Sequence, residues 1–381
     1  MAEKIIGILG GGQLGRMFIE EALRYNIRCH ILDADKDCPA AVIADHHVVG
    51  SLTDPKKIAE LADGCDVLTY EIEHIFIETL LELEREGKEL IPSPRVLQII
   101  QDKGAQKNFF LQNQIPTSGF FIAENREELL EKASSLTGKK LVLKSSRHGY
   151  DGRGVEIISR QDLMNGKSSL AFPVVAEEFI SGAKEIAVIV AVDRKQNVSC
   201  YPAVEMEFDS HANLVRRLFS PSVLPEKIIQ EAEAIAKTCA LKFNSPGLFA
   251  VEMFVDEMGN ILVNEVAPRP HNSGHHTIEA CYTSQYEQLL RILLGIPLGS
   301  TKLIQPAAMI NLLGGKNFSG KYQLANRDQI LAMEGVYVHL YGKSESRPMR
   351  KLGHITILAA SHELLMEKTK RVEQLAEIIP A

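Results

Sequence analysis

Short apolar runs alternate with segments of helical periodicity over the first hundred residues. Ile5–Leu9 is apolar, Leu14–Tyr25 repeats its apolar residues at helical spacing, and Arg28–Leu32 is a second apolar run. This order predicts a β-α-β unit. The pattern continues as helix, strand, helix and strand over Asp54–Ala62, Cys65–Tyr70, Ile77–Glu86 and Glu89–Ile91, followed by the break Pro92-Ser93-Pro94. We expect an α/β domain over residues 1–100.

Strands predominate after this boundary. A helix over Gln101–Asn113 leads into a small α+β module, with a helix at Arg126–Leu136 and strands at Lys140–Ser145, Val155–Ile158 and Val174–Phe179. The pattern then predicts two strands, a helix and a β-hairpin, at Ile186–Val192, Val198–Val204, Glu226–Thr238 and Leu248–Glu265. Short strands near 307–313, 335–341 and 354–358 precede a closing helix, Ser361–Glu377. We expect one unit over 101–180 and an α+β domain with a terminal β subdomain over 181–381.

Composition excludes several classes of protein. With 45% hydrophobic and 24% charged residues the chain is an ordinary globular protein, and a net charge of −7 gives no general attraction to nucleic acid or anionic membranes. Apolar runs stay far below the ~20 residues of a membrane span. The six cysteines form no Cys-x-x-Cys pair, which is typical of free thiols in a reducing compartment. We therefore expect a cytoplasmic protein.

A glycine-rich turn, Gly10-Gly11-Gly12-Gln13-Leu14-Gly15, connects the first strand to the first helix. With Asp33 at the end of the second strand, this turn satisfies the pattern of a dinucleotide fingerprint. Backbone N–H groups at a helix N-terminus bind any phosphate equally well. The turn alone leaves a nicotinamide cofactor, another phosphate ligand and a purely structural turn open.

Two carboxylates and a histidine follow the strand that ends at Tyr70, in Glu71-Ile72-Glu73-His74. Ligands of open α/β sheets bind at the carboxyl ends of the strands. The segment is therefore a candidate ligand contact, and a solvated strand end is the alternative.

The predicted hairpin brings two more carboxylates together. If Glu257–Asn260 form a four-residue loop, Asp256 pairs with Ile261, Phe254 with Val263, and Glu252 with Glu265. Carboxylates ~5 Å apart repel each other by about 3 kcal/mol at an effective dielectric constant of ~20. A shared divalent cation reverses that sign, and Mg²⁺ accepts carboxylates with waters and phosphates. A different register or splayed side chains would remove the pair.

Basic groups and glycines flank this pair in the sequence. Arg269 and His271 lie in a Pro-stiffened loop directly after the hairpin, where three histidines raise a zinc site as a weaker alternative. Lys144 lies between apolar residues in a strand, and Gly149-Tyr150-Asp151-Gly152-Arg153-Gly154 follows with the glycines and backbone donors of a phosphate-covering loop.

Taken together, these motifs and Gln101-Asp102-Lys103 with Lys107 resemble the ATP-grasp superfamily, and within it the 5-(carboxyamino)imidazole ribonucleotide synthases of purine biosynthesis. Asn264–His275 is the most specific stretch. The resemblance implies a Rossmann-like pre-ATP-grasp domain, a lid and a C-terminal ATP-grasp domain. It also implies MgATP- and bicarbonate-dependent carboxylation of aminoimidazole ribonucleotide through carboxyphosphate, with ADP and phosphate as products, by a homodimer.

The resemblance further implies roles for individual residues. Residues that surround bicarbonate, carboxyphosphate and the attacking amine are Asp151, Arg153, Arg269 and His271. The Mg²⁺ ligands are Glu252 and Glu265. Contacts to the nucleotide substrate are Gln13, Glu73, His74, Tyr150, Lys343 and Arg350, the last two facing its 5′-phosphate. Contacts to ATP are Lys103, Lys144, His148, Gly149, Tyr150, Asp151, Gly152, Arg153, Gly154, Glu177, Glu178, Phe179, Ile180, Glu185, His211, Asn264 and Glu265.

Three other functions compete with this interpretation. One is a different ATP-grasp ligase, such as a formate-dependent glycinamide ribonucleotide transformylase. A nicotinamide dehydrogenase rests on the glycine turn and Asp33 alone. A regulatory nucleotide-binding protein without turnover is disfavoured by the intact Glu252, Glu265, Arg269 and Asp151.

Overall fold

The computed structural model describes residues 4–147, 154–208 and 214–381. Seven predicted site residues lie outside the described residues: His148, Gly149, Tyr150, Asp151, Gly152, Arg153 and His211. Among the helices that the structure describes, none is long and apolar enough to cross a membrane.

The N-terminal unit is a parallel five-stranded sheet in the order β3-β2-β1-β4-β5, which confirms the predicted α/β domain. Its elements are β1 (Ile5–Leu9), α1 (Gln13–Arg24), β2 (Arg28–Asp33), β3 (His46–Val49), α2 (Pro55–Asp63), β4 (Val67–Tyr70), α3 (Ile77–Arg85) and β5 (Glu89–Leu90). Strand β3, which is only four residues long, was not predicted from the sequence. The strand order reverses beside β1, so the ends of β1 and β4 lie where such sheets bind ligands.

Two helices connect this sheet to the next unit. We expected a break at Pro92-Ser93-Pro94, but α4 (Pro94–Ile100) begins there, with Ser93 as its N-cap. Proline is favoured in a first helical turn because its missing N–H is not needed there. Helix α5 (Lys103–Gln112) follows, and the Asp102 side chain accepts a hydrogen bond from the N–H of Ala105.

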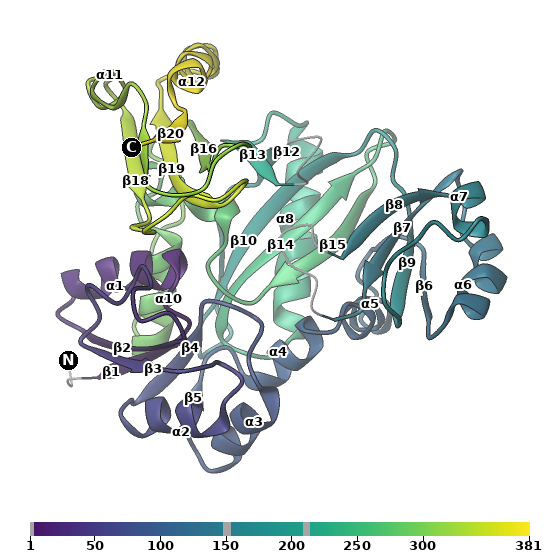
Figure 1. Ribbon diagram of the computed structural model, residues 1–381, viewed down its shortest axis with the longest axis horizontal. Coiled ribbons are helices and arrows are strands. Elements are labelled where there is room, and N and C mark those ends of the chain that lie inside the picture. The colour runs from purple at the N-terminus through teal and green to yellow at the C-terminus, as the bar shows by residue number, and fades with distance from the viewer. Residues whose placement is uncertain (1–3, 148–153, 209–213) are drawn as a thin grey trace.

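The second unit is a four-stranded antiparallel sheet in the order β6-β9-β7-β8. It consists of β6 (Phe120–Ala123), α6 (Arg126–Lys132), β7 (Lys140–Ser145), β8 (Val155–Ser159), α7 (Arg160–Met164) and β9 (Val174–Glu178). Leu129 of α6 and Leu163 of α7 pack with Leu141 and Leu143 in a separate small core. This unit extends to one side of the molecule, as Figure 1 shows.

A nine-stranded sheet forms the centre of the molecule, in the order β15-β14-β10-β12-β13-β16-β19-β18 with β11 beside β10. Its first strands are β10 (Lys184–Val192), β11 (Val198–Cys200), β12 (Val204–Phe208), β13 (Val215–Ser220), β14 (Gly247–Val255) and β15 (Ile261–Ala267). The prediction of a single strand over Val198–Val204 was wrong. The chain forms two strands there, β11 and β12, which pair with different parts of β10.

Helices cover both faces of this sheet. Ile186, Val188 and Val190 of β10 pack in one cluster with α8 (Glu226–Lys242), whereas Ile189 and Ala191 pack in another with α10 (Gln285–Leu294). Successive side chains of a strand point to opposite faces, so a strand covered on both sides is continuously apolar.

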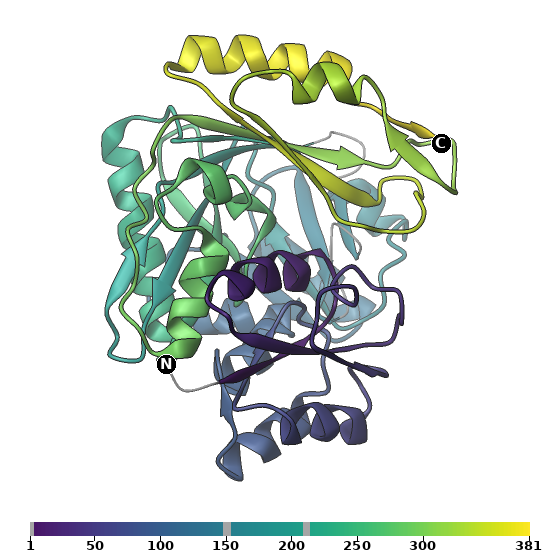
Figure 2. The same ribbon diagram turned by 90° about the vertical axis from the view of Figure 1, so that its left-hand side faces the viewer.

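The predicted terminal β subdomain continues the same sheet. Strands β16 (Ala307–Leu313), β18 (Val336–Leu340) and β19 (Lys351–Leu358) extend it, and α12 (His362–Leu375) packs against them. Smaller elements complete the chain: β17 (Tyr322–Leu324), α11 (Arg327–Leu331), β20 (Ile378–Pro380) and α9 (Thr277–Ala280). Figure 2 shows this layer above the N-terminal sheet.

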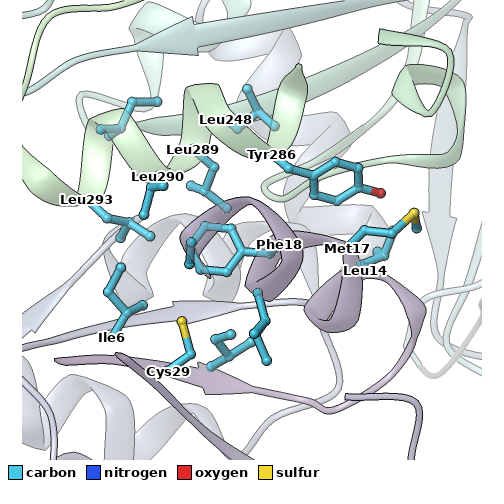
Figure 3. Packing of buried hydrophobic residues seen from close by; sticks show 14 of the residues in the cluster. Ile6, Leu14, Met17, Phe18, Cys29, Leu248, Tyr286, Leu289, Leu290 and Leu293 are labelled. Carbon is cyan, nitrogen blue, oxygen red and sulfur yellow. The ribbon is translucent and has the colours of Figure 1, made fainter. Parts of the chain in front are cut away.

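Helix α1 joins the N-terminal sheet to the central sheet. Phe18 of α1 packs in one buried cluster with Leu289, Leu290 and Leu293 of α10, as Figure 3 shows. Beside this cluster the Tyr25 hydroxyl donates to Glu287 at 2.6 Å. The contact fixes the C-terminal end of α1 against the start of α10.

Candidate active site

Glu252 and Glu265 pair directly across the β14–β15 hairpin, as predicted. The register that led to this prediction was wrong: Val255 pairs with Ile261, and Phe254 with Leu262. A bulge at Asn264 inserts one residue and restores the Glu252–Glu265 pair. The extra residue contributes to the site, because the side-chain amide oxygen of Asn264 accepts a hydrogen bond from the Lys144 ammonium group at 2.8 Å.

Each carboxylate of the pair has a basic partner. Lys103 Nζ lies 2.8 Å from Glu265 Oε2, and His271 Nε2 lies 3.3 Å from Glu252 Oε1. Lys103 lowers the pKa of Glu265, whereas burial and the Glu265 charge raise the pKa of Glu252. Burial also raises the pKa of nearby Glu185 to about 7. The charges of Glu265 and Glu185 therefore both act on Glu252 at this point of the hairpin.

A buried ion network lies beside this acidic group. The Glu177 carboxylate forms ion pairs with Lys107 at 2.7 Å through one oxygen and with Lys144 at 2.8 Å through the other. Its partners hold the pKa of Glu177 at about 2 against the opposing effect of burial. A small pocket joins the network to the hairpin and is lined by Lys103, Gln106, Lys107, Lys144, Glu177, Asn264 and Glu265. The pocket thus combines three ammonium groups with the end of the acidic hairpin.

The start of α5 is tied to the strand that carries Lys144. The N–H of Lys103 donates to the carbonyl of Ser146 at 2.8 Å, and the Ser146 hydroxyl donates to Asp102 at 2.9 Å. These bonds fix Lys103 and Lys144 relative to each other. The Asp102 and Ser146 contributions were not identified from the sequence, since an Asp at a helix start is usually only a cap.

The Pro-stiffened loop after β15 is held from two sides. Arg269 Nε donates to Glu73 Oε1 at 2.8 Å, which joins the loop to the segment after β4. Gln285, the first residue of α10, accepts from the N–H of His271 at 2.9 Å and donates to its carbonyl at 2.8 Å. Sequence reasoning missed Gln285, because nothing in the local pattern relates it to a residue fourteen positions earlier.

The backbone N–H groups of the glycine turn donate hydrogen bonds to carboxylates of the protein itself. Glu71 accepts from the N–H groups of Gly12 and Gly15, at 2.6 and 2.8 Å, and Asp33 accepts from Gly11 at 2.8 Å. Of the interpretations that the sequence left open, the structure favours the structural turn over a phosphate cradle. Gln13, the first residue of α1, lies on the same turn.

The expected adenine-binding segment, Glu177 to Ile180, begins in β9 and continues past its end. The N–H of Glu178 donates to Gly119, and its carboxylate accepts from Thr137, so both groups have partners within the small unit. Phe179 and Ile180 follow the strand and are partly exposed. Gly154 closes the end of β7 through its carbonyl, which accepts from Ser145 at 2.8 Å.

The C-terminal cations lie between β18 and β19. Lys343 donates to the carbonyl of Lys351 at 2.8 Å, and Arg350 donates to the carbonyl of Glu345 at 2.7 Å. Lys351, which sequence analysis did not select, acts electrostatically on Glu252 and on His275. His74 is exposed at the end of β4.

Three family models match successive parts of the chain. A ribonucleotide synthetase preATP-grasp domain matches residues 3–101, an ATP-grasp domain matches residues 108–286, and a phosphoribosylaminoimidazole carboxylase C-terminal domain matches residues 307–368.

Several proteins of about the same length are named N5-carboxyaminoimidazole ribonucleotide synthase or synthetase. The N5-carboxyaminoimidazole ribonucleotide synthase of Synechococcus elongatus is 35% identical, over 98% of this chain and 95% of its own length. The structure of N5-carboxyaminoimidazole ribonucleotide synthetase from Thermotoga maritima is 40% identical, with a TM-score of 0.90 over 99% of this chain and 100% of that one. The Aspergillus clavatus synthase in complex with ADP and 5-aminoimidazole ribonucleotide is 33% identical, with a TM-score of 0.87 over 98% and 97% of the two chains.

Some relatives are longer. The chain spans 65% of the chloroplastic phosphoribosylaminoimidazole carboxylase of Vigna aconitifolia, to which it is 40% identical over 94% of its own length. The full-length matches, the three consecutive family models and the paired carboxylates agree with one another. This chain belongs to the N5-carboxyaminoimidazole ribonucleotide synthase family of the ATP-grasp superfamily.

Proposed function

We propose that the protein carboxylates 5-aminoimidazole ribonucleotide on its exocyclic amine, with consumption of ATP and bicarbonate and release of ADP and phosphate. The observation that carries this proposal is the Glu252–Glu265 pair beside Lys103 and Lys144, because it matches the charge pattern that a metal-bound triphosphate requires. Two relatives of about this length are named for the carboxyamino product of this reaction.

ATP would lie between the small four-stranded unit and the central sheet. Lys103 and Lys144 line the pocket there and would neutralise its phosphates. Adenine would bind along the backbone from Glu177 to Ile180, and Glu185 would accept a hydrogen bond from the ribose. Asn264, the glycine loop from His148 to Gly154 and His211 complete the proposed ATP contacts.

Magnesium fits the residues at the hairpin. Among the described residues, no group of three or more Asp, Glu, His or Cys side chains converges to hold a metal. Mg²⁺ on a nucleotide is commonly held by one or two carboxylates plus phosphates and water, so Glu252 and Glu265 suffice. Burial and the neighbouring Glu265 charge raise the pKa of Glu252, and a divalent cation would favour its charged form. When bound, the ion would offset the charge of the phosphates.

Bicarbonate and carboxyphosphate would meet Arg269 and His271. The Arg269 guanidinium lies beside Glu73, and the His271 ring contacts Glu252 through one nitrogen and Ser273 through the other. Arg269 would stabilise the charge of the acyl phosphate, and the fixed His271 ring would orient the reactants. Asp151 and Arg153 would approach from the glycine loop.

The nucleotide substrate would bind between the N-terminal sheet and the C-terminal cations. Gln13, Glu73, His74 and Tyr150 would contact its base and ribose, and Lys343 and Arg350 its 5′-phosphate. We add Lys351 as a third cation on the same side, because of its influence on Glu252.

The test is an ADP assay with MgATP, bicarbonate and aminoimidazole ribonucleotide. We expect ADP formation that requires all three, with the carboxyamino nucleotide as the product. ADP release no faster than in a blank without the nucleotide rejects the proposal. Replacing bicarbonate by formate and the nucleotide by glycinamide ribonucleotide tests the transformylase alternative, and NADH formation from a panel of hydroxy acids tests the dehydrogenase.

We further propose a homodimer in the cytoplasm and a three-part division of the chain at residues 100 and 180. The six free cysteines fit a reducing compartment. Sedimentation equilibrium gives the mass of the particle directly: about 84 kDa is expected from two copies of a 42.2 kDa chain. A particle with the mass of a single chain contradicts the dimer.

A further inference from the structure

Glu71 fills the N-terminus of α1 in the way that a phosphate does in dinucleotide-binding proteins. Its two carboxylate oxygens each accept one backbone N–H, from Gly12 at 2.6 Å and from Gly15 at 2.8 Å. Both donors belong to the turn at the start of a 12-residue helix. Helix dipole and unpaired N–H groups favour an anion at this position. Here the anion is a side chain of the same domain.

The glycines of the turn are required by this side chain. A Cβ on Gly12 would lie 2.5 Å from Glu71 Oε1, and a Cβ on Gly10 would lie 2.3 Å from Glu71 Cγ. Gly10 also has φ +110°, which side chains other than glycine rarely adopt. The glycine pattern that resembles a dinucleotide fingerprint is therefore explained by the space that the Glu71 carboxylate occupies.

Glu71 begins a segment that reaches the proposed substrate site. Two residues later, Glu73 accepts from Arg269 at 2.8 Å. The Gln101 side chain donates to the carbonyls of Glu73 and Ile75, at 2.7 and 2.8 Å. The segment is thus fixed at its start by Glu71 and farther along by Gln101, with Glu73 between them.

We propose that Glu71 is a positioning residue, which ties the segment after β4 to the glycine turn so that Glu73 holds Arg269 in place for the nucleotide substrate. The role assigned to Glu73 and Arg269 rests on the proposed function. Glu71 itself accepts hydrogen bonds from the backbone of the turn.

Two variants disturb the hydrogen bonds between Glu71 and the glycine turn in different ways. Glu71→Gln keeps the shape, but its amide can accept only one of the two N–H groups and turns a donor toward the other. Gly12→Ala leaves the carboxylate unchanged and displaces it through the added Cβ. Glu82→Gln, on the exposed surface of α3, is the matched control in the same unit.

Hydrogen exchange and steady-state kinetics provide separate measurements. We expect faster amide exchange in the peptide covering residues 71–76 for both variants. We also expect roughly a tenfold rise in KM for aminoimidazole ribonucleotide, with KM for ATP within about twofold of the wild-type value. The Glu82→Gln variant should match the wild type in every measurement.

The outcomes are distinguishable. Unchanged exchange over residues 71–76 in Glu71→Gln overturns the positioning role, whatever the catalytic activity. Equal rises in KM for both substrates together with a lower Tm also overturn it, because they indicate general destabilisation. If the wild type forms no ADP in response to the nucleotide, the proposed function fails, and the exchange measurement still decides whether Glu71 positions the segment.

Discussion

Lys107 and Lys144 share one buried carboxylate, and this arrangement defines the charge at the centre of the site. Lys107 is 3% exposed, and the Thr117 and Ser118 hydroxyls lie 2.7 and 3.1 Å from its ammonium group. Burial lowers its pKa to about 8, although Glu177 acts in the opposite direction. The motif Asp102-Lys103 with Lys107 was recognisable in the sequence. Its function as an ion network was not, because Glu177 lies seventy residues away.

Lys107→Met should destabilise the protein by about 3 kcal/mol, because Glu177 keeps only one of its two cations. Lys144 should then be drawn more firmly to Glu177, so KM for ATP should rise. Chemical denaturation followed by circular dichroism measures the first effect, since the chain has no Trp. Thr117→Val, which removes a single hydroxyl, should cost only about 1 kcal/mol. Equal stability of Lys107→Met and the wild type would contradict the network.

Buried histidines should make the protein sensitive to acid. Burial lowers the pKa of His276 to about 4, and it lowers the pKa values of His275 and His354 well below the usual range. The unfolded chain then binds more protons than the folded one below pH 6.5. Stability is therefore fully present above pH 6.5 and is lost as the pH falls toward 4.

His276→Leu tests this sign. At pH 5 the neutral His276 accounts for about 2 kcal/mol of lost stability, so the variant should lose less on going from pH 7.5 to pH 5. Denaturation midpoints at pH 7.5, 6 and 5 provide the comparison. Met258→Leu, at an exposed position without a titratable group, is the control and should keep the wild-type pH dependence. Identical pH slopes for His276→Leu and the wild type would refute the assignment.

The packing of helix α1 against helix α10 supports the geometry of the site. Phe18 is 2% exposed and packs among leucines of α10, and α10 begins at Gln285, which holds the backbone of His271. The amphipathic pattern of α1 was clear from the sequence. Its partner α10 was not predicted, although Ser284 with Glu287 at its start and Gly295 at its end are typical helix-capping residues.

Phe18→Ala should cost about 3–5 kcal/mol, since it leaves a cavity between two packed helices. Leu23→Ala, on the 53% exposed position of the same helix, should stay within about 0.5 kcal/mol of the wild type. Urea denaturation of both variants measures the difference. A loss below about 1 kcal/mol for Phe18→Ala would mean that the interface does not hold the two sheets together.

The proposed nucleotide site belongs to the whole molecule, because its groups come from α5, β7, β9, β10 and the β14–β15 hairpin. A ligand bound between units stabilises their assembly. At one hundred times its Kd, MgADP should add about 2.7 kcal/mol to the free energy of unfolding. Chelation of Mg²⁺ should remove most of this gain.

Glu265→Gln should weaken the Mg²⁺ dependence of this stabilisation and of turnover, while the fold stays intact because one of two repelling carboxylates is neutralised. Differential scanning calorimetry with ADP and varied Mg²⁺ measures the response. Glu257→Gln, in the exposed hairpin loop, is the control. An unchanged Mg²⁺ response of Glu265→Gln contradicts the ligand role.

The sequence by itself determined the α/β N-terminal unit, the antiparallel hairpin with its facing glutamates and the order of the family motifs. These features depend on local periodicity, and residues two or four positions apart encode it directly. The hairpin also shows what local periodicity cannot predict. The Glu252–Glu265 pair was predicted correctly, but the register between the turn and the bulge at Asn264 was not.

Tertiary structure decided which charges meet. Glu71 in the glycine turn, Glu177 between two lysines and Gln285 behind His271 are each contacts between segments distant in the chain. A carboxylate has the same local signature whether it caps a turn, balances buried lysines or faces solvent. Its role follows from burial and from the partners that folding brings within hydrogen-bond distance, because only there does an unpaired charge become costly.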